Sequence, residues 1–207
     1  ARVLLLVDGA QGGGHLPIDL SETGIDVLTL AGHKGLMGIQ GSGALLFSER
    51  ANPRPLLYGG TGSDSFSLNM PDFYPDALEA GTLSFPAVSS LLEGVRYLSA
   101  KEKEISGSLL FLTGYLLDAL AGLPAYKVFS RPNPCGIVAF AHREIQSEIL
   151  SERLSEVYSI AVRGGLHCAP LMHEALGTKE NGLVRVSFSH FNRKEEVNAL
   201  IRALRAF

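Results

Sequence analysis

The chain is poor in the residues that would tie it to an oxidising compartment, a membrane or a nucleic acid. Two cysteines among 207 residues are too few for a disulfide framework, so reduced thiols and a cytoplasmic location are expected. With a net charge of −3 and no long basic run, neither a nucleic acid nor an anionic membrane is expected as a partner. The first hydrophobic run, Leu4 to Val7, is far too short to span a bilayer, and no signal-peptide cleavage pattern follows it.

Several patterns that carry chemistry are also absent from the sequence. Four histidines are scattered along the chain at spacings that suit no metal site: His15, His142, His173 and His190. Neither a zinc-binding pattern nor a Ser-His-Asp motif occurs. The run Gly12-Gly13-Gly14 lacks the spacing of a dinucleotide fingerprint. We therefore expect neither a metal nor a dinucleotide. Apolar residues are plentiful, 46% hydrophobic against 19% charged, which is enough for a sizeable core in one or two domains.

Two short hydrophobic runs end in side chains that could do chemistry together. The run from Val3 is followed by Asp8, and the run from Ile25 is followed by a turn that contains Lys34. Ligands of α/β sheets lie outside the carboxyl ends of parallel strands, so both side chains should reach one crevice. Pyridoxal phosphate (PLP) needs a lysine for its covalent attachment and an acid that keeps its pyridine nitrogen protonated. The pair therefore predicts a PLP site; a solvated loop lysine and a turn-capping aspartate are the alternatives.

Periodicity predicts an α/β chain. Strands are expected at about 3 to 8, 25 to 31 and 43 to 48, as compact runs of the kind buried on both faces of a parallel sheet. Residues 52 to 85 are rich in Gly, Pro, Ser and Asp and should be irregular. Beyond them the pattern predicts helices at 86 to 100, 103 to 120, 143 to 156, 170 to 176 and 193 to 206, with strands at 126 to 130, 136 to 141, 159 to 163 and 183 to 189.

A set of motifs in a fixed order then points to a family. They are Asp8-x-Ala10-Gln11, Gly32-His33-Lys34-x-Leu36-x-Gly38, Gly41-x-Gly43, Gly59-Gly60-Thr61-Gly62, Glu79-Ala80-Gly81-Thr82, Arg163-x-Gly165-x-His167-Cys168-Ala169, and Arg185-x-Ser187 with Phe191-Asn192 and Glu195-Glu196. With these motifs the chain resembles the class V aminotransferase family of fold-type I PLP enzymes. Within that family the branch of cysteine desulfurases and selenocysteine lyases fits best.

The resemblance implies the C-terminal part of a PLP-dependent transferase fold. Residues 1–100 would be the C-terminal part of the large PLP-binding domain, with its parallel or mixed sheet, and residues 101–207 a small α/β domain. Family members begin well upstream of the aspartate strand, whereas this chain enters that strand at about residue 3 without an initiator methionine. We therefore expect the chain to be the C-terminal portion of a larger enzyme that forms a homodimer.

The resemblance also assigns roles to the candidate residues of the first half. Lys34 would hold the cofactor and serve as a base, and Asp8 would pair with the pyridine nitrogen. Gln11 would lie near the phenolic oxygen of the cofactor and His33 near its phosphate. Thr82 would reach the phosphate of the partner subunit, although a helix cap before Pro86 is an equally good interpretation.

The second half supplies candidates for binding and transforming an amino acid. Strand alternation turns Arg185 away from its apolar neighbours, and by resemblance its guanidinium clamps the substrate carboxylate, with Arg163 as a weaker candidate. Cys168 stands on a glycine-flanked loop before a helix, where Arg163 and His167 would favour its thiolate form. By resemblance that thiolate takes sulfur from L-cysteine, releases L-alanine and passes the sulfur to an acceptor protein, as in iron-sulfur cluster assembly.

Other functions stay open at the level of the sequence. The chain could belong to another class V enzyme, an aminotransferase or a selenocysteine lyase, in which Cys168 is not essential. It could also be a dimerisation and small-domain remnant without a competent pocket. Cys135 matches no family motif, and we expect it to be structural.

Overall fold

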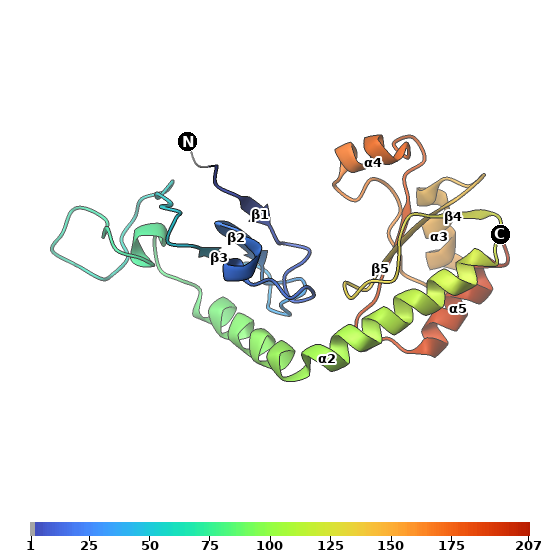
Figure 1. The fold of residues 1–207 in the computed structure, drawn as a ribbon, viewed down its shortest axis with the longest axis horizontal. Helices are drawn as coiled ribbons and strands as arrows, with labels where there is room; N and C mark the ends of the chain where they lie inside the picture. Colours follow the sequence, from blue (N-terminus) through green and yellow to red (C-terminus); the bar gives the residue numbers. More distant parts are fainter. Residues whose placement is uncertain (1–2) are drawn as a thin grey trace. The chain divides into compact units, whose positions relative to one another are not determined.

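The computed structural model describes residues 3–207 and divides into two compact units, Ala1–Ala100 and Lys101–Phe207, called unit 1 and unit 2 below (Figure 1). Each unit contains a three-stranded sheet, with strand orders β1-β2-β3 and β4-β5-β6. The chain is therefore α/β in both halves. The boundary falls inside helix α2 (Phe85–Ala121), which runs through it without a break.

The sheet of unit 1 brings two carboxyl ends to the same edge. Its strands are β1 (Leu6–Asp8), β2 (Val27–Ala31) and β3 (Gly43–Phe47). β1 runs parallel to β2 with Asp8 opposite Thr29, whereas β3 is antiparallel to β2. The parallel pair was expected from the sequence. The expectation that the third strand is also parallel is wrong, because a connection of only 11 residues, 32–42, turns the chain straight back beside β2.

A buried carboxylate fastens the far end of this sheet. Asp26, 1% exposed, accepts hydrogen bonds from the backbone amide of Leu5 at 2.9 Å and from the Ser48 hydroxyl at 3.2 Å. It also forms an ion pair with Arg50 at 2.6 Å. The Leu5 amide is the main reason that the pKa of Asp26 lies below its usual value. Before it, the short helix α1 (Leu20–Thr23) is capped by Asp19 and ends at Gly24.

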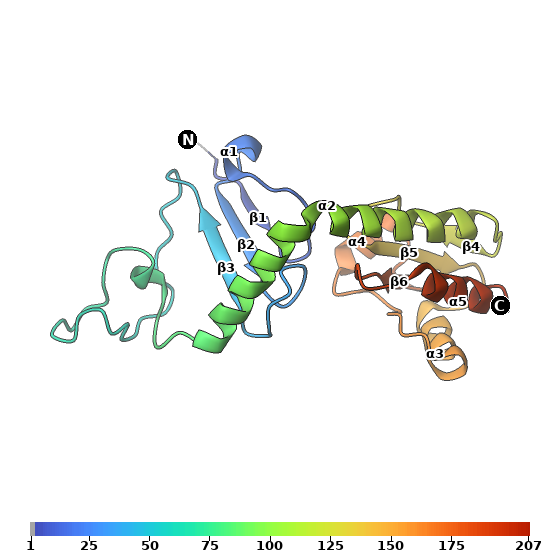
Figure 2. The same ribbon diagram turned by 90° about the horizontal axis from the view of Figure 1, so that it is seen from below.

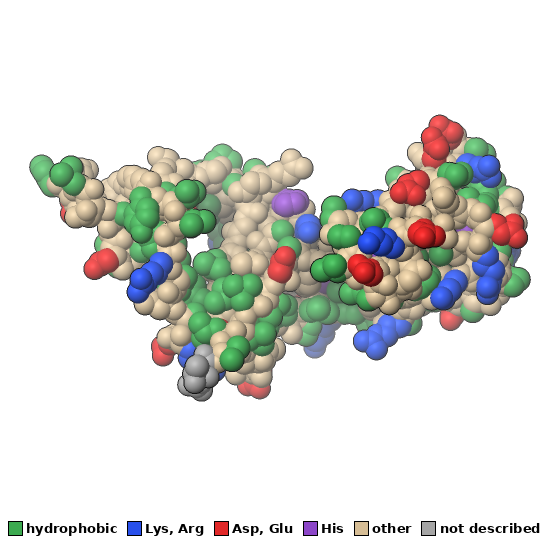
Figure 3. Space-filling model, turned by 90° about the horizontal axis from the view of Figure 1, so that it is seen from above, with side chains coloured by type: hydrophobic (Ala, Val, Ile, Leu, Met, Phe, Trp, Pro, Cys, Tyr) green, Lys and Arg blue, Asp and Glu red, His purple; other side chains and the backbone are tan. Residues whose placement is uncertain are grey.

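Unit 1 leaves much of its apolar surface uncovered. Leu6 on β1 is 64% exposed and Leu46 on β3 is 43% exposed, so the expectation of strands buried on both faces is wrong for β1 and β3. The segment between β3 and α2 contains the 3₁₀ turn η1 (Asp76–Leu78), and its Phe66 is 100% exposed. Hydrophobic side chains gather over unit 1 in the space-filling view (Figure 3), whereas charged side chains are more frequent over unit 2. Apolar surface of this extent needs covering by another segment or chain.

Unit 2 has a dense core. Its strands are β4 (Tyr126–Val128), β5 (Ile137–His142) and β6 (Val184–Ser187), all paired antiparallel. Its helices, besides the second half of α2, are α3 (Ser147–Tyr158), α4 (Pro170–Leu176) and α5 (Lys194–Leu204). They pack a cluster of buried side chains on the sheet, including Leu112, Leu116, Phe140, Leu150, Leu154, Val184 and Val197. α2 and α5 run side by side (Figures 1 and 2), and the Tyr115 hydroxyl donates to Asn198 Oδ1 at 2.7 Å.

Helix α2 is one helix of 37 residues, so the prediction of two helices at 86–100 and 103–120 is wrong. Neither Pro nor Gly lies between Ser99 and Glu104, and nothing there interrupts the backbone hydrogen bonds. By length and composition α2 could also span a membrane. Its Leu112, Leu116 and Leu120 belong to the core of unit 2, so the second half of α2 is a core helix of that unit.

The predicted strand at 159–163 does not form. α3 ends at Tyr158, Ser159 adopts a left-handed conformation, and residues 160–163 pair with the sheet only through an isolated bridge between Arg163 and Arg185. The apolar side chains Ile160 and Val162 pack against the core without a regular ladder. This segment therefore leads directly into the loop that carries Cys168.

Candidate active site

Asp8 and Lys34 follow the carboxyl ends of the parallel pair β1 and β2. Asp8 is the last residue of β1, and its carboxylate accepts a hydrogen bond from the Ala10 amide at 2.9 Å. Lys34 comes three residues after Ala31, the last residue of β2, in a turn closed by the Gly38 amide on the Gly32 carbonyl at 2.7 Å. Both side chains are exposed, and Lys34 Nζ has no hydrogen bond or ion pair within residues 3–207. A carboxylate and an uncommitted amine thus share one sheet edge.

The turn that carries Lys34 is held by close backbone contacts. A Cβ on Gly14 would overlap the backbone of Gly35, and Gly14 itself has a φ of 82°, so a side chain is excluded there twice. A Cβ on Gly35 would lie 2.8 Å from Cδ2 of His15. The half-buried ring of His15 therefore packs directly against the residue after Lys34. No sequence pattern singles out His15, whose spacing from the other histidines suits no metal site.

The first turns of α2 support the same turn from another side. A Cβ on Gly94 would overlap the Leu36 carbonyl, so the helix and the turn are in backbone contact. The Ile39 amide also donates a hydrogen bond to the Ser90 hydroxyl at 2.9 Å. The position of Lys34 is thus fixed by β2, by the Gly14–His15 segment and by α2.

The other cofactor candidates of unit 1 are surface groups. Gln11 lies in the turn after β1, and His33 precedes Lys34; both are exposed. Thr82 is exposed as well and lines an open pocket. The other lining residues include Thr61 and Glu79, Asp76 of η1, and Phe85 and Val88 at the start of α2. The Gly81 amide donates to the Gly60 carbonyl at 3.0 Å, which joins the two glycine-rich motifs at this pocket. α2 begins at Phe85, three residues after Thr82.

These residues fit PLP. The cofactor requires an amine, a carboxylate and an approach for its phosphate to backbone amides, and unit 1 provides Lys34, Asp8 and glycine turns without space for side chains. His33 and Gln11 extend the donor set at the same edge of the sheet.

In unit 2, backbone hydrogen bonds fasten the segment of Arg163 to β6. The Arg185 amide donates to the Arg163 carbonyl at 2.8 Å, and the Arg163 amide donates to the Arg185 carbonyl at 3.1 Å. The Leu183 amide donates to the Gly165 carbonyl, also at 3.1 Å. The two arginines are therefore directly opposite each other in an antiparallel bridge. Two cationic side chains on directly paired residues create a positive potential that favours binding of an anion.

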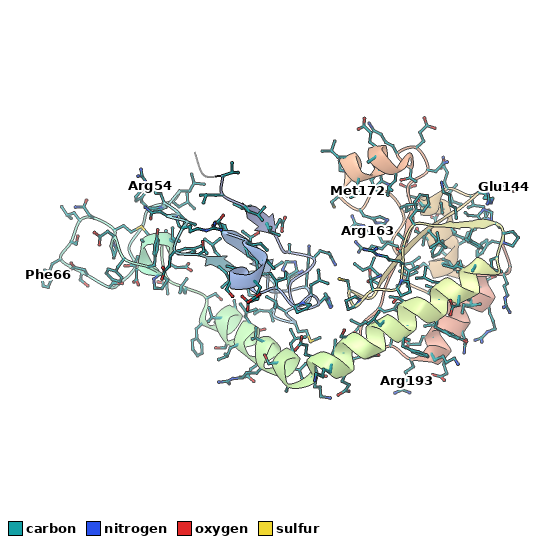
Figure 4. All side chains as sticks on the ribbon, in the orientation of Figure 1. Arg54, Phe66, Glu144, Arg163, Met172 and Arg193 are labelled. Atoms are coloured by element: carbon teal, nitrogen blue, oxygen red, sulfur yellow. The ribbon has the colours of Figure 1, made fainter. Side chains whose placement is uncertain are left out.

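Cys168 stands at the end of this segment with its thiol exposed. A guanidinium nitrogen of Arg163, Nη2, lies 3.4 Å from Cys168 Sγ, and Figure 4 labels Arg163 on the segment below α4. His167 and Cys168 both have positive φ, 52° and 60°, so the backbone turns sharply at these residues before α4 begins at Pro170. The loop thus brings the thiol to a guanidinium, as the sequence suggested.

Arg185 and His167 are in a less solvated setting than Arg163. Burial is the main cause that lowers the pKa of Arg185, followed by the charge of Arg163, whereas Cys168 raises it. Burial also lowers the pKa of His167, which keeps its ring neutral at pH 7. The neutral ring forms a hydrogen bond between its Nε2 and the Leu183 carbonyl at 2.9 Å.

Ser147 is a second residue that sequence reasoning did not find. It is 3% exposed at the start of α3; its hydroxyl accepts from the Gly165 amide at 3.0 Å and donates to the Asn181 carbonyl at 2.7 Å. A Cβ on Gly182 would overlap this hydroxyl, and a Cβ on Gly164 would overlap the Ser147 carbonyl. Ser147 therefore ties the loop of Cys168 to the turn before β6. The sequence places Ser147 only inside the helix predicted at 143 to 156; the structure shows that the helix starts at this residue.

Two remaining expectations concern cysteine and metal. Cys135 is half-buried, and burial raises the pKa of its thiol, which suits a structural residue. Within residues 3–207, no group of three or more His, Cys, Asp or Glu side chains is arranged to hold a metal ion.

The fold and these residues are those of a PLP-dependent enzyme, and comparison with known proteins identifies the family. The family model "Aminotransferase class-V" matches residues 1–200, and the chain belongs to this family. The chain is 33% identical over 214 residues to a probable cysteine desulfurase of Pasteurella multocida, covering 99% of this chain and 49% of the relative. It is 32% identical over 212 residues to the cysteine desulfurase CsdA of Escherichia coli, covering 99% and 51%.

Solved structures give the same result for the fold. The crystal structure of CsdA from Escherichia coli matches with a TM-score of 0.85 at 30% identity, over 98% of this chain and 51% of that one. The apo structure of a cysteine desulfurase from Thermococcus onnurineus matches with a TM-score of 0.88 at 29% identity, over 98% and 52%. The expected fold class, part of a PLP-dependent transferase fold, is confirmed. The chain spans about half the length of the curated relatives it matches.

Proposed function

We propose that the protein to which this chain belongs is a PLP-dependent cysteine desulfurase, and that the chain supplies its lysine and its sulfur-accepting cysteine. The observation that carries the proposal is the exposed Cys168 thiol at 3.4 Å from the Arg163 guanidinium, on a loop fastened to the strand of Arg185. An aminotransferase needs an arginine for the substrate carboxylate but has no use for a thiol held beside a cation. The relatives named as cysteine desulfurases support the same assignment.

The residues of unit 1 would hold the cofactor. Lys34 would attach it covalently, Asp8 would keep its ring nitrogen protonated, and His33 and Gln11 would contact its phosphate and phenolic oxygen. When bound, PLP supplies an electron sink for charge that develops on the substrate. The amine of Lys34, freed when substrate binds, would move protons at the substrate α-carbon. Thr82 would contact a phosphate across a dimer interface.

The residues of unit 2 would bind the amino acid and take its sulfur. Arg185 would bind the substrate carboxylate through paired hydrogen bonds. The Cys168 thiolate, held by Arg163, would attack the sulfur of L-cysteine. A sulfur-sulfur bond forms, the carbon-sulfur bond breaks, and its electron pair and a proton stay with the former Cβ, which becomes the methyl group of L-alanine. In total, Cys168 thiol and L-cysteine give Cys168 persulfide and L-alanine, with no external oxidant.

We further propose the setting in which this reaction takes place. The protein would be a cytoplasmic homodimer, with residues of about 59 to 85 near the subunit interface. Exposed apolar side chains in this segment, such as Phe66, Phe73 and Leu83, support that placement. Its persulfide would pass sulfur to an acceptor protein, as iron-sulfur cluster assembly requires. Residues 1–100 would belong to the large domain of the whole enzyme and residues 101–207 would be its small C-terminal domain. Light scattering of the purified protein tests the dimer: a monomer would overturn that part of the proposal.

Two substitutions in the whole protein test the desulfurase assignment. Cys168→Ala should lower the release of alanine from L-cysteine by at least about 10³-fold, because the nucleophile is gone, while the visible absorption band of bound PLP persists. Lys34→Ala should remove that band. Alanine release at the parent rate from Cys168→Ala would show that the enzyme is an aminotransferase or another lyase, and an unchanged band in Lys34→Ala would overturn the cofactor site.

A further inference from the structure

Helices α2 and α5 of unit 2 enclose an open groove that the proposed reaction does not use. The groove has a volume of about 510 Å³ and lies where the two helices run side by side (Figures 1 and 2). Its floor is formed by Tyr115 and Ala119 of α2, which are half-buried, and by the buried Ile201 of α5. A groove with an apolar floor is a common seat for one face of an amphipathic helix.

The side chains that α5 presents along this groove are basic. Arg202 and Arg205 line it and are exposed. Lys194 lies at the other end of α5, with its ammonium nitrogen 4.6 Å from the centre of the Tyr115 ring on the floor. Positions eight and eleven residues after Lys194 fall on the same face of a helix, so the three cations follow one edge of the groove.

The protein does not neutralise these cations itself. Within residues 3–207, neither Arg202 nor Arg205 forms an ion pair. The acidic residues of α5, Glu195 and Glu196, do not line the groove, whereas Asp118 of α2 does. Three cationic side chains and one carboxylate leave a local charge of +2, although the chain as a whole carries −3. A confined positive potential on an otherwise acidic protein attracts an acidic partner.

The floor of the groove is an ordered aromatic surface. The Tyr115 hydroxyl is held by Asn198 Oδ1 at 2.7 Å, and the Tyr115 ring stacks on that of Phe111 with 5.9 Å between centroids. Phe111 is 55% exposed, so the stacked pair extends the apolar surface along α2 toward solvent. Tyrosine and arginine are the residue types that, with tryptophan, contribute most to binding at protein interfaces. The groove thus combines an aromatic anchor with uncommitted guanidinium groups.

The distribution of charge favours a peptide helix over a nucleic acid as the occupant. Asp118 stands on the α2 side of the groove, opposite the arginines of α5, and would repel a continuous phosphate backbone. A helix can instead place its carboxylates only where the cations are. The distance along α5 from Lys194 to Arg205 is roughly 16 Å, or about three helical turns.

We propose that the α2–α5 groove binds an acidic amphipathic helix of a partner protein. The carboxylates of this helix pair with Arg202 and Arg205 at one end and with Lys194 at the other, and its aliphatic face covers Tyr115 and Ala119. None of these residues is among those proposed to hold cofactor or substrate. Binding of the partner helix is therefore independent of the desulfurase assignment.

The whole protein can be tested with a defined probe. The probe is a fluorescently labelled helical peptide of glutamate, alanine and leucine with its leucines on one face, and a twin peptide carries lysine in place of glutamate. In fluorescence anisotropy, the glutamate peptide should bind and should bind more weakly as the salt concentration rises, whereas the lysine peptide should not bind. Binding of neither peptide, or of both with equal affinity, contradicts the proposal.

Charge reversal tests whether the peptide binds at this place. Arg202→Glu combined with Arg205→Glu should lower affinity for the glutamate peptide at least about tenfold. The matched control is Arg131→Glu combined with Arg153→Glu, which changes the net charge equally at two exposed arginines outside the groove. Equal losses in the two variants would mean attraction to overall charge and would overturn the site. If circular dichroism shows that the first variant is unfolded, Arg202→Gln with Arg205→Gln replaces it, with the same ranking against the control.

A neutral substitution tests the groove itself. Ala119→Gln puts a longer polar side chain on the floor without changing any charge, and it should weaken binding of the glutamate peptide about tenfold. Unchanged affinity would show that the peptide does not lie in the groove. A single-stranded oligodeoxynucleotide that binds more tightly than the glutamate peptide, and loses affinity in the Arg202 and Arg205 variant, would assign the surface to nucleic acid instead.

Discussion

Unit 1 and unit 2 are similar in length but differ in how completely they bury their sheets. In unit 2, Val138, Phe140 and Val184 have no exposed surface, and helices α2, α3 and α5 close one core. In unit 1, Leu6 and Leu46 of the sheet are exposed and the buried apolar residues are few. The proposed cofactor residues lie on the incompletely covered unit, and the sulfur-handling residues lie on the well-packed one. We therefore expect unit 1 to depend more strongly than unit 2 on additional protein surface for its stability.

The largest effect should come from opening the core of unit 2. Phe140→Ala removes a ring that packs edge-on to Tyr126 at 5.6 Å between centroids, and we expect a loss of about 3–5 kcal/mol in the free energy of unfolding. Leu46→Ala in unit 1 should change it by roughly 0.5 kcal/mol or less, because that side chain is already exposed. Urea unfolding followed by circular dichroism measures both. Equal losses would mean that unit 1 is packed as well as unit 2.

Substitution of a glycine that packs against the Lys34 turn should lower stability and PLP affinity more than substitution of a glycine remote from that turn. Gly14→Ala adds both a strained φ and an overlap with Gly35, so we expect a cost of roughly 2 kcal/mol or more and weaker PLP binding. Gly24→Ala is the control, since Gly24 has a similar φ of 69° but no atom within 4 Å of the added Cβ. PLP titration followed at the visible band tests the pair. Similar PLP affinities in the two variants would contradict a role for the Gly14 contact in shaping the lysine turn.

In unit 2, loss of the Ser147 hydroxyl should loosen the loop of Cys168. Ser147→Ala leaves the Gly165 amide without its acceptor and should cost about 1–3 kcal/mol, with faster reaction of the Cys168 thiol toward a thiol reagent. Ser151→Ala removes only a local bond to Glu148 within α3 and serves as the control. If both serine variants react with the reagent at the parent rate, Ser147 does not restrain the loop.

Acid should produce the smallest effect, and both units should contribute to it. Burial lowers the pKa of His167 in unit 2 and of His15 in unit 1. At a pH near the ordinary histidine pKa of 6.5 the unfolded chain therefore binds more protons than the folded chain, so stability should fall as the pH is lowered through this value. Carboxyl groups with lowered pKa values, such as Glu196, act only at lower pH. His167→Asn should reduce the dependence of Tm on pH in this range, measured by thermal unfolding at a series of pH values. An unchanged dependence of Tm on pH would show that the pKa of His167 is not lowered by folding.

Both units contain features that could be predicted from the sequence and features that could not. The strand ends at Asp8 and Ala31 were predictable, because apolar runs and glycine turns are local signals and the family motif fixes Lys34. The antiparallel direction of β3 was also within reach of the sequence, because the strands predicted at 25 to 31 and 43 to 48 leave a connection too short for a parallel crossover. The helix α1 was missed although Asp19 and Gly24 mark its ends, because one turn has too few residues to show periodicity.

The candidate site was predictable in its residue types but not in its supporting contacts. Motif order places Arg163, Cys168 and Arg185 near one another along the chain, and the structure adds the bridge and the thiol contact that join them. Ser147 and His15 act through shape and burial, and these depend on segments that meet only in the folded chain. No local pattern could have indicated them.

The helix start at Pro170 limits how far a sulfur atom on Cys168 can travel. Proline lacks an amide hydrogen and disfavours helical geometry in the residue before it, so α4 can neither extend back over Cys168 nor give up length easily to the loop. On the other side, Gly165 is anchored by Ser147 and Leu183. From that anchor, three residues of extended chain reach roughly 10 Å. In the proposed desulfurase, a receiving thiol would therefore have to come within this short distance of the protein surface, because the loop is too short to carry the sulfur farther.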